Sequence, residues 1–326
     1  MATVTTSPGQ RTAAERSSDL NVLVRRQRSL WQDAWYRLLR NKAAVVGMVI
    51  VVLFMVLAII SPFLTQWGLI HDPLKQDTPN SLMEPLWTQS KFTHANYPLG
   101  SDQLGRDIFA RLLWSTQISM LVGFVPVAII FLMGVTIGLM AGYLGGWVDQ
   151  LLMRITDVIY AFPDLLFLFI IMATLRNTAV GDIQGGLFLI FIAIAIVNWV
   201  GMARLVRGQV LSLKEREFVE AARAIGAPSK RIMIRHLFPN ILAPVIVSVA
   251  FGIPNAMLAE AVLSFYGIGI KPPTPSWGVM INEGFTVFST TAWPVLLPAV
   301  CISVVMLAFT FLGDGLRDAL DPRMKL

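Results

Sequence analysis

The chain has 326 residues, of which 55% are hydrophobic and only 14% are charged, whereas soluble domains carry about 25% charged residues. A soluble domain of this size cannot bury so much apolar surface. Although the net charge is +6, this composition excludes a soluble globular protein, a disordered chain and a nucleic-acid-binding domain. The sequence therefore predicts an integral membrane protein.

Six apolar stretches are long enough to cross a bilayer, for which a helix needs about 20 residues. Because backbone polar groups cannot stay unpaired in lipid, and the stretches lack an alternation of period two, we expect helices. The third stretch differs from the others because it contains Arg154, Asp157 and Asp164. The predicted fold is an all-α membrane protein with six transmembrane helices, at about 43–62, 117–142, 151–175, 185–205, 241–263 and 293–313.

The distribution of basic residues predicts the orientation of these spans. With both termini on one side, that side holds 20 of the Lys and Arg residues and the other side holds 6. Because basic residues concentrate in cytoplasmic segments, both termini are expected in the cytoplasm. Residues 1–28 are then a disordered cytoplasmic tail without a cleavable signal peptide, and 314–326 form a second cytoplasmic tail.

Two further segments flank the first span. Residues 29–42 predict an amphipathic helix at the membrane interface, since apolar residues recur every three to four positions beside Arg37, Arg40 and Lys42. Residues 61–116 form one long extracytoplasmic loop with five prolines, and 264–292 form another outer segment. Loops of this length are uncommon unless they are functional or partly structured.

The second span contains Gly134, Gly138 and Gly142 at four-residue spacing. Small residues in this register let another helix approach closely. The alternative is that glycine is simply frequent in membrane helices. We favour a packing ridge.

Motifs for catalysis are missing from the sequence. None of the seven lysines follows a glycine, which excludes a Walker A loop, and neither a zinc-protease motif nor a nucleophile elbow is present. We therefore predict no catalytic, metal or cofactor site in this chain, and Cys301 is expected to be a small buried apolar residue. Within the third span, Arg154 and Asp157 can pair at i, i+3. Asp164 is interpreted either as a proton relay or as a polar or helix-end residue after Pro163.

The loop at 207–240 has the pattern of a helical hairpin. Residues 214–225 predict a helix with Phe218, Ala222 and Ile225 on an apolar face, and with Glu220 able to pair with Arg216 and Arg223. Gly226 would end this helix, and Pro239 would close a second short helix over 229–238. The hairpin is either an interfacial amphipathic element or a docking element for a cytoplasmic protein.

The same hairpin resembles the EAA loop of ABC importer permeases, E-A-A-x3-G-x9-I-x-L-P. In that family the loop contains the coupling helix that sits in a cleft of the ATPase subunit. Here His236 replaces the isoleucine and Phe238 replaces the leucine, which is typical of the peptide-permease branch. The matching residues are Glu220, Ala221, Ala222 and Gly226, followed after nine residues by His236, Leu237, Phe238 and Pro239.

A segment of the first outer loop resembles the H-P-L-G-T-D-x-x-G-R-D signature of dipeptide and oligopeptide permease C subunits. Tyr97 stands for the histidine and Ser101 for the threonine, and residues 313–323 resemble the ending of the same subfamily. Arg106 and Asp107 either shape this loop or cap the helix that leads into the second span. The matching residues are Pro98, Leu99, Gly100, Asp102, Gly105, Arg106 and Asp107.

The resemblance implies a C-type permease subunit of a dipeptide/oligopeptide ABC importer, with a type I, MetI-like fold and a cytoplasmic coupling helix. It also implies a heterodimer with a B-type permease, two cytoplasmic ATPases that carry the ATP and Mg, and an extracytoplasmic solute-binding protein that docks on the outer loops. The location would be the plasma (inner) membrane of a bacterium or archaeon.

Other solutes and one other class of transporter stay open at this point. Nickel complexes, glutathione and oligosaccharides are solutes of the same subfamily. An ion-coupled secondary transporter would use Asp164 at a central site. A membrane enzyme would need a catalytic cluster, which the sequence lacks.

Overall fold

The computed structural model describes residues 30–321, so the predicted tail at 1–28 lies outside the described residues. Five long helices are each apolar enough to cross a membrane. They are α3 (Lys42–Gln66), α4 (Ile108–Leu144), α8 (Leu187–Leu213), α11 (Phe238–Phe265) and α13 (Trp293–Leu320). The shorter α-helices are α2 (Leu30–Arg40), α5 (Gly146–Tyr160), α6 (Asp164–Leu175), α7 (Ala179–Asp182), α9 (Glu217–Ala224), α10 (Ser229–Arg231) and α12 (Trp277–Phe285).

The third predicted span is broken. The sequence predicts one helix at 151–175, whereas α5 and α6 meet at a bend of 82°. Pro163 explains the break, because proline lacks an N–H and disfavours a helical backbone at the preceding residue, Phe162. With the bent pair counted as one span, the described chain has the six predicted spans.

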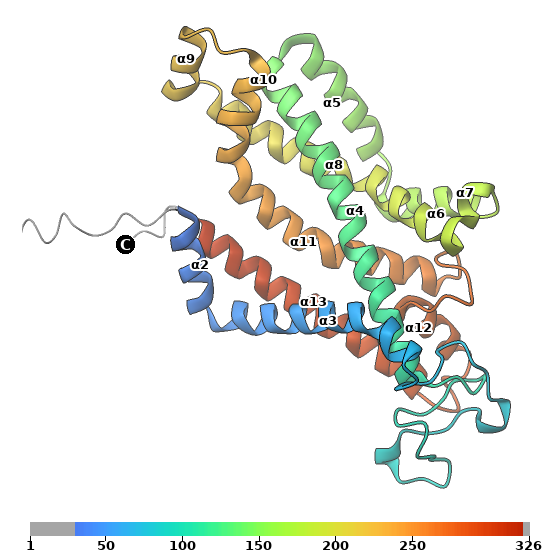
Figure 1. Ribbon diagram of the computed structural model, residues 1–326. Helices are drawn as coiled ribbons and strands as arrows, with labels where there is room; N and C mark the ends of the chain where they lie inside the picture. Colours follow the sequence, from blue (N-terminus) through green and yellow to red (C-terminus); the bar gives the residue numbers. More distant parts are fainter. Residues whose placement is uncertain (1–29, 322–326) are drawn as a thin grey trace, which may run out of the picture.

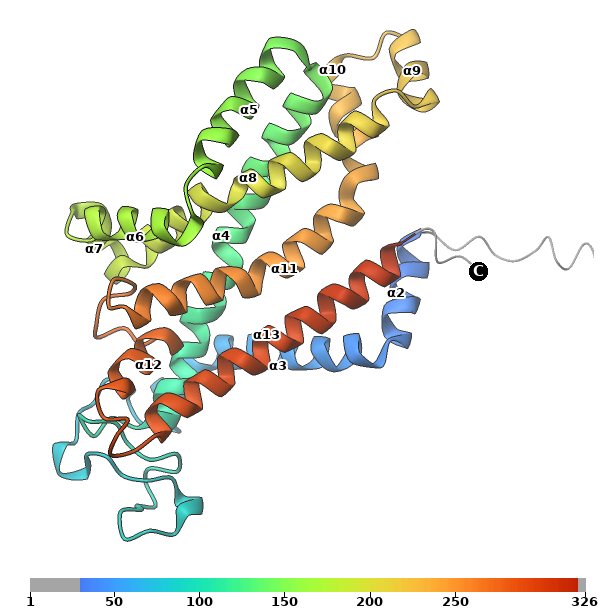
Figure 2. The same cartoon turned by 180° about the vertical axis from the view of Figure 1, so that it is seen from behind.

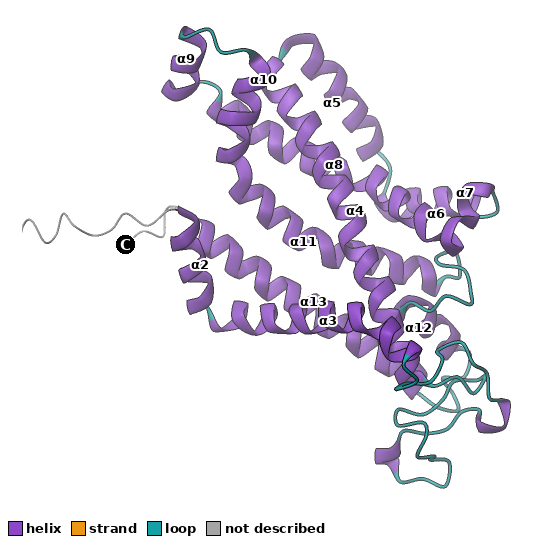
Figure 3. Cartoon of the chain, viewed as in Figure 1, coloured by secondary structure: helices purple, strands orange, loops and turns teal. Residues whose placement is uncertain are grey.

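The long helices form two groups joined by α11 and by a direct contact of α3 with α4 (Figures 1 and 2). In one group α4 packs along α8, with α5 beside them, and in the other α13 packs along α3. α11 contacts both α4 and α13. The irregular segments, drawn in teal in Figure 3, gather mainly between α3 and α4 and around α12, at the end of the molecule opposite α9 and α10.

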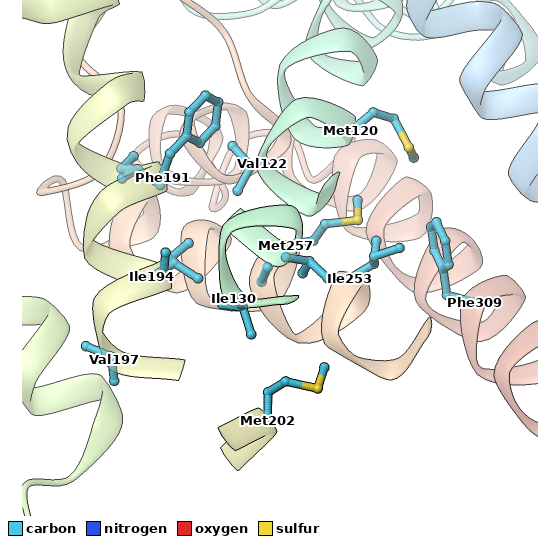
Figure 4. Packing of buried hydrophobic residues seen from close by; sticks show 14 of the residues in the cluster. Met120, Val122, Ile130, Phe191, Ile194, Val197, Met202, Ile253, Met257 and Phe309 are labelled. Carbon is cyan, nitrogen blue, oxygen red and sulfur yellow. The ribbon is translucent and has the colours of Figure 1, made fainter. Parts of the chain in front are cut away.

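The core of the bundle lies where α4, α8, α11 and α13 meet (Figure 4). Aromatic packing adds to it, since the rings of Phe124 and Phe309 stand edge to face with centroids 6.0 Å apart. Apolar side chains from all four helices contribute: Met120, Val122, Ile130, Phe191, Ile194, Val197, Met202, Ile253, Met257 and Phe309.

α4 approaches α8 through its three spaced glycines. A Cβ atom on Gly134 would lie 2.5 Å from the Cβ of Met202, and one on Gly138 would lie 2.6 Å from the carbonyl oxygen of Ala203. One on Gly142 would lie 2.8 Å from the Cβ of Val210. No side chain fits at these distances, so the glycines allow the close contact of the two helices.

Several helices extend beyond the predicted spans. α4 begins at Ile108 instead of near residue 117, and α13 continues to Leu320, where the sequence predicts a tail from 314. The predicted limits follow the apolar runs and therefore omit helical turns that carry charge, such as those of Arg111 and Arg317. At 37 residues, α4 is about 55 Å long, well beyond the ~30 Å of bilayer hydrocarbon.

α2 corresponds to the amphipathic helix predicted at 29–42. Ala34 and Leu38 are buried against Ala44 and Ala319, so this face packs on the start of α3 and the end of α13. Trp31 and Trp35 are about half exposed. The predicted apolar residues of α2 therefore lie on two sides of the helix. One side packs on the bundle, and the other carries the two exposed tryptophans, as in helices of a membrane interface.

Candidate functional site

The α9 segment, residues 214–239, contains the EAA-like motif. Within it, α9 is bounded by Gly226, whose φ is +78°. The Gly226 N–H donates to the Arg223 carbonyl at 2.9 Å, and the Ala227 N–H donates to the Ala222 carbonyl at 3.0 Å. This pair of hydrogen bonds is the Schellman motif, in which a left-handed glycine ends a helix.

α9 is attached to the bundle by one face and presents another outward. Val219 and Ala222 are buried, whereas Phe218 is 39% exposed and Ile225 is 85% exposed. The predicted apolar face of Phe218, Ala222 and Ile225 is therefore split between the bundle and the surroundings. Phe218 stands in the first turn of α9 and Ile225 directly after its last residue, so exposed apolar side chains at both ends of this short helix form a surface that a partner protein can cover.

The charges on α9 do not pair as the sequence predicts. Within the described part of the chain Glu220 makes no ion pair with Arg216 or Arg223. Instead, the Arg223 guanidinium lies 5.3 Å from the centroid of the Tyr143 ring, at the end of α4. This contact links α9 to the α4–α5 turn.

Pro239 does not end a short helix, contrary to the prediction for 229–238. The helix runs from Ser229 to Phe265 through α10, a π-helical stretch (Ile232–Leu237) and α11, in whose first turn Pro239 stands. Proline lacks an N–H and its ring clashes with the carbonyl four residues earlier. The wider π-helical turn accommodates both defects, so α10, the π-helical stretch and α11 form one continuous helix that begins after the Gly226 turn.

The second candidate region is the signature in the 67–107 loop. Gly105 has a φ of +73°, and a Cβ there would lie 1.8 Å from the Asp77 carbonyl oxygen. Gly100 is similarly close to the Met83 carbonyl oxygen. The Asp102 carboxylate accepts the backbone N–H groups of Leu104 at 2.9 Å and Arg106 at 3.0 Å. The signature is thus a tight turn built on glycine and on one carboxylate.

Asp102 also belongs to a buried charge cluster, which consists of Asp102, Arg106, Arg111 and Glu283. Arg106 donates to Asp102 at 2.6 Å and to Glu283 at 2.7 Å. Arg111 donates to Glu283 at 2.7 Å and also to Asp102. Two guanidinium groups and two carboxylates therefore balance, and the cluster fastens the loop to α4 and α12.

Sequence reasoning missed the two partners of this cluster. Arg111 stands at the start of an apolar run, and Glu283 is the only acidic residue between Glu260 and Asp314. The isolated position of Glu283 in a long apolar region is the feature of the sequence that could have indicated a buried partner. Their pairing across 172 residues, however, depends on the tertiary fold.

Asp107 caps α4, because its carboxylate accepts the Phe109 N–H at 2.9 Å. Burial raises the pKa of Asp107. The Phe109 N–H and His71, whose Nδ1 lies 3.0 Å from the carboxylate, act in the opposite direction and lower it. In the same loop, hydrogen bonds from Asn80 and Tyr97 lower the pKa of Asp77. Burial and the bond to Asp77 raise the pKa of Tyr97 to about 12.

Glu260 on α11 is a further residue that sequence reasoning missed. Its carboxyl group is buried and accepts hydrogen bonds from the Ser264 hydroxyl at 2.6 Å and the Ser276 hydroxyl at 2.7 Å. Ser276 in turn accepts the Val279 N–H at the start of α12. Glu260 therefore fixes α12 from the side opposite to the charge cluster.

No group of three His, Cys, Asp or Glu side chains that could hold a metal occurs within residues 30–321. The two candidate regions consist of a contact surface and of ion pairs. One region is exposed and apolar, and the other is a loop held by buried charges.

Comparison with known families gives two matches that together include most of the chain. Residues 134–326 match the binding-protein-dependent transport system inner membrane component. Residues 29–85 match the N-terminal transmembrane domain of oligopeptide transport permease C. The first match includes the α9 segment.

Known proteins of similar sequence are permeases. The dipeptide transport system permease protein DppC of Bacillus subtilis is 40% identical over 95% of this chain and 91% of its own length. The oligopeptide transport system permease protein OppC of the same organism is 36% identical over 96% of each chain. A solved chain of the MetNI methionine ABC transporter, in inward-facing conformations, is 17% identical, with a TM-score of 0.49 over 65% of this chain and 96% of that chain.

Proposed function

The chain belongs to the family of binding-protein-dependent transport system inner membrane components, and we propose that it is the C-type permease subunit of an ATP-driven peptide importer. The observation that carries this proposal is the 40% identity to a dipeptide permease over nearly the full length of both chains. The subunit forms half of the translocation path, while partner chains hydrolyse the ATP. Its partners are a B-type permease, two cytoplasmic ATPases and an extracytoplasmic solute-binding protein.

The α9 segment is the docking element for an ATPase in this proposal. Its exposed Phe218 and Ile225 supply the apolar contact, and Gly226 gives the turn that brings them to the surface. Because α8 enters the segment and the helix of α10 and α11 leaves it, a displacement of α9 is transmitted to both helices. Movement of the ATPases thereby changes the spacing of helices in the membrane.

The orientation follows from the same proposal. Both termini and the α9 segment face the cytoplasm, where most basic residues then lie, and the 67–107 loop and α12 face the binding protein. Cysteines placed at Ser90 or Thr274 should react with an impermeant thiol reagent in intact cells, whereas one at Lys230 should not. Labelling of Lys230→Cys from outside would contradict the orientation.

Uptake in reconstituted vesicles tests the transport class. The complex of this chain with its sister permease and ATPases should import labelled dialanine only when ATP and the loaded binding protein are both present. A proton gradient in vesicles without ATP should drive no uptake. Uptake driven by the gradient alone would instead favour an ion-coupled transporter that uses Asp164. If ATP drives uptake of a nickel complex or an oligosaccharide in preference to peptides, the chain is still an ABC importer subunit, but its solute is not a peptide.

A further inference from the structure

α5 presents two different faces outside the chain. Only Thr156 among its residues is buried. One exposed stripe is apolar and consists of Trp147, Leu151, Ile155 and Val158. A second exposed stripe, at the same spacing of three to four residues, is polar and consists of Gln150, Arg154 and Asp157. Residues at this spacing share one side of a helix, so α5 has an apolar face and, next to it, a polar face.

The polar stripe continues onto neighbouring elements. The Arg204 guanidinium of α8 donates to Asp157 at 2.8 Å and lies 4.3 Å from the centroid of the Tyr160 ring. Asp157 therefore pairs with Arg204. The sequence instead predicts a pair with Arg154. Asp164, also exposed, begins α6 directly after the bend. We call this set the α5 polar face: Arg154, Asp157, Tyr160, Asp164 and Arg204.

A polar face of this kind does not lie against lipid. Charged side chains in membrane-spanning segments are costly in hydrocarbon and face water or another polar surface. Broken helices in transporters are accommodated where they line a water-filled cavity, and the α5 polar face borders the bend between α5 and α6. An open groove of about 570 Å³ runs along the part of α5 nearer to the α4–α5 turn, with Arg154 and Asp157 but not Asp164 in its lining.

The charges of the α5 polar face indicate what it binds. It holds two guanidinium groups and two carboxylates, of which Asp157 and Arg204 neutralise each other. Within the described residues, Arg154 and Asp164 have no ion-pair or hydrogen-bond partner. The face thus offers one available cation and one available anion. A solute with a free ammonium and a free carboxylate matches both charges, whereas a neutral sugar matches neither and a cationic metal complex matches only that of Asp164.

We propose that the α5 polar face lines the solute path and binds short peptides by their charged ends, with the ammonium at Asp164 and the carboxylate at Arg154. This inference rests on the proposed transport function and adds the residues that contact the solute. The pair formed by Asp157 and Arg204 holds α5 against α8 beside this site. The bidentate pair of Arg207 with Asp149, at 2.6 and 2.7 Å, does the same nearer to the α4–α5 turn.

Transport and ATP hydrolysis, measured in the same proteoliposomes, separate this role from a structural one. Arg154→Gln and Asp164→Asn should each lower the rate of dialanine uptake about tenfold, because each removes one charge-assisted contact. Hydrolysis stimulated by the loaded binding protein should stay within about twofold of the unaltered complex. Asp314→Asn is the matched control, since it neutralises an exposed carboxylate on α13, and it should change neither rate.

Thiol labelling tests the exposure of the same face to water. In a complex with Cys301→Ser, Ala161→Cys should react with a water-soluble thiol reagent, and dialanine should slow the reaction. Ile59→Cys, at an exposed apolar position of α3, should stay unreactive. Normal uptake by both charge variants, an equal loss of uptake and hydrolysis, or an unreactive Ala161→Cys would each overturn the inference. If instead the unaltered complex shows no ATP-driven uptake, the proposed function itself is wrong.

Discussion

The charge cluster and the α9 segment both contain acidic and basic residues, yet these residues are paired in one region and not in the other. In the charge cluster, three buried groups from residues 102–111 are bonded to one another or to the partly buried Glu283 of α12. In the α9 segment, Glu220 makes no ion pair within the described chain, and Ile225 is almost fully exposed. The first region balances its charges within this chain, although two buried nitrogens of Arg111 have no hydrogen-bond partner among the described residues, whereas the second leaves its apolar and charged groups available to another protein.

Because of this difference, substitutions in the charge cluster should lower the free energy of unfolding, whereas substitutions in the α9 segment should mainly reduce function. Removing one member of a buried ion network leaves an uncompensated charge and costs several kcal/mol. Changing an exposed side chain costs little stability, so any large functional loss must come from a contact outside the chain. The first three of the following variants are ordered by their expected effect on the free energy of unfolding, and the fourth is tested by its dependence on pH.

Arg111→Met should have the largest effect on stability. It leaves Asp102 and Glu283 with Arg106 as their only cationic partner in the cluster, and it should lower the free energy of unfolding by about 3–5 kcal/mol. Urea unfolding of the purified protein in detergent measures this change. Lys91→Met, in the exposed part of the same loop, is the control and should have almost no effect. Equal stability of the two variants would show that the cluster is dispensable.

Much of the architecture follows from sequence patterns, because a membrane imposes simple rules. Runs of about 20 apolar residues indicate helices, which gives six spans. The helix-ending role of Gly226 and the capping role of Asp107 also follow from local chemistry, since each depends on neighbours in the chain. Local rules of this kind do not need the tertiary fold.

What the sequence does not reveal depends on distant partners or on competing local preferences. Asp157 pairs with Arg204 of α8 in preference to the nearby Arg154, and Glu283 meets Arg111 across 172 residues. Pro239 would end an ordinary helix, but a π-helical stretch lets the helix continue. The 82° bend at Pro163 falls inside an apolar run whose composition gives no sign of its angle.

Gly226→Val should have an intermediate effect on stability and a large effect on coupling. A Cβ at this position meets no atom within 4 Å, so the cost is the strain of a positive φ, about 1–2 kcal/mol. The strained turn would displace α9 and abolish stimulation of ATP hydrolysis by the binding protein. Gly208→Val is the control, because Gly208 also has open space around it but lies in α8 without a positive φ. Loss of stimulated hydrolysis in both variants would contradict the role of the turn.

Ile225→Asp should change stability by no more than about 0.5 kcal/mol, because the side chain is 85% exposed. Stimulated hydrolysis should nevertheless be lost, since a carboxylate replaces the apolar group offered to the ATPase. The same substitution at Leu144, an exposed position at the end of α4 beyond the predicted span 117–142, tests whether the loss is specific to α9. If Ile225→Asp keeps full stimulation, the exposed residue does not contact the ATPase and the segment is an interfacial hairpin.

Tyr97→Phe removes one hydrogen bond, and its effect on stability should be present below pH 10 and fade at alkaline pH. In the folded chain the Tyr97 hydroxyl donates to Asp77 at 2.7 Å, and its pKa rises from the ordinary value of 10.0 to about 12. Because the folded state holds this proton more tightly than the unfolded state, the contribution to stability is fully present below pH 10. It declines as the pH rises from 10 towards about 12, where both states lose the proton. Midpoints of thermal unfolding, measured from pH 8 to the alkaline limit, should therefore fall more steeply for the unaltered protein than for Tyr97→Phe. Parallel curves for the two proteins would mean that the hydroxyl ionises alike in both states and that its bond to Asp77 adds no stability that depends on pH.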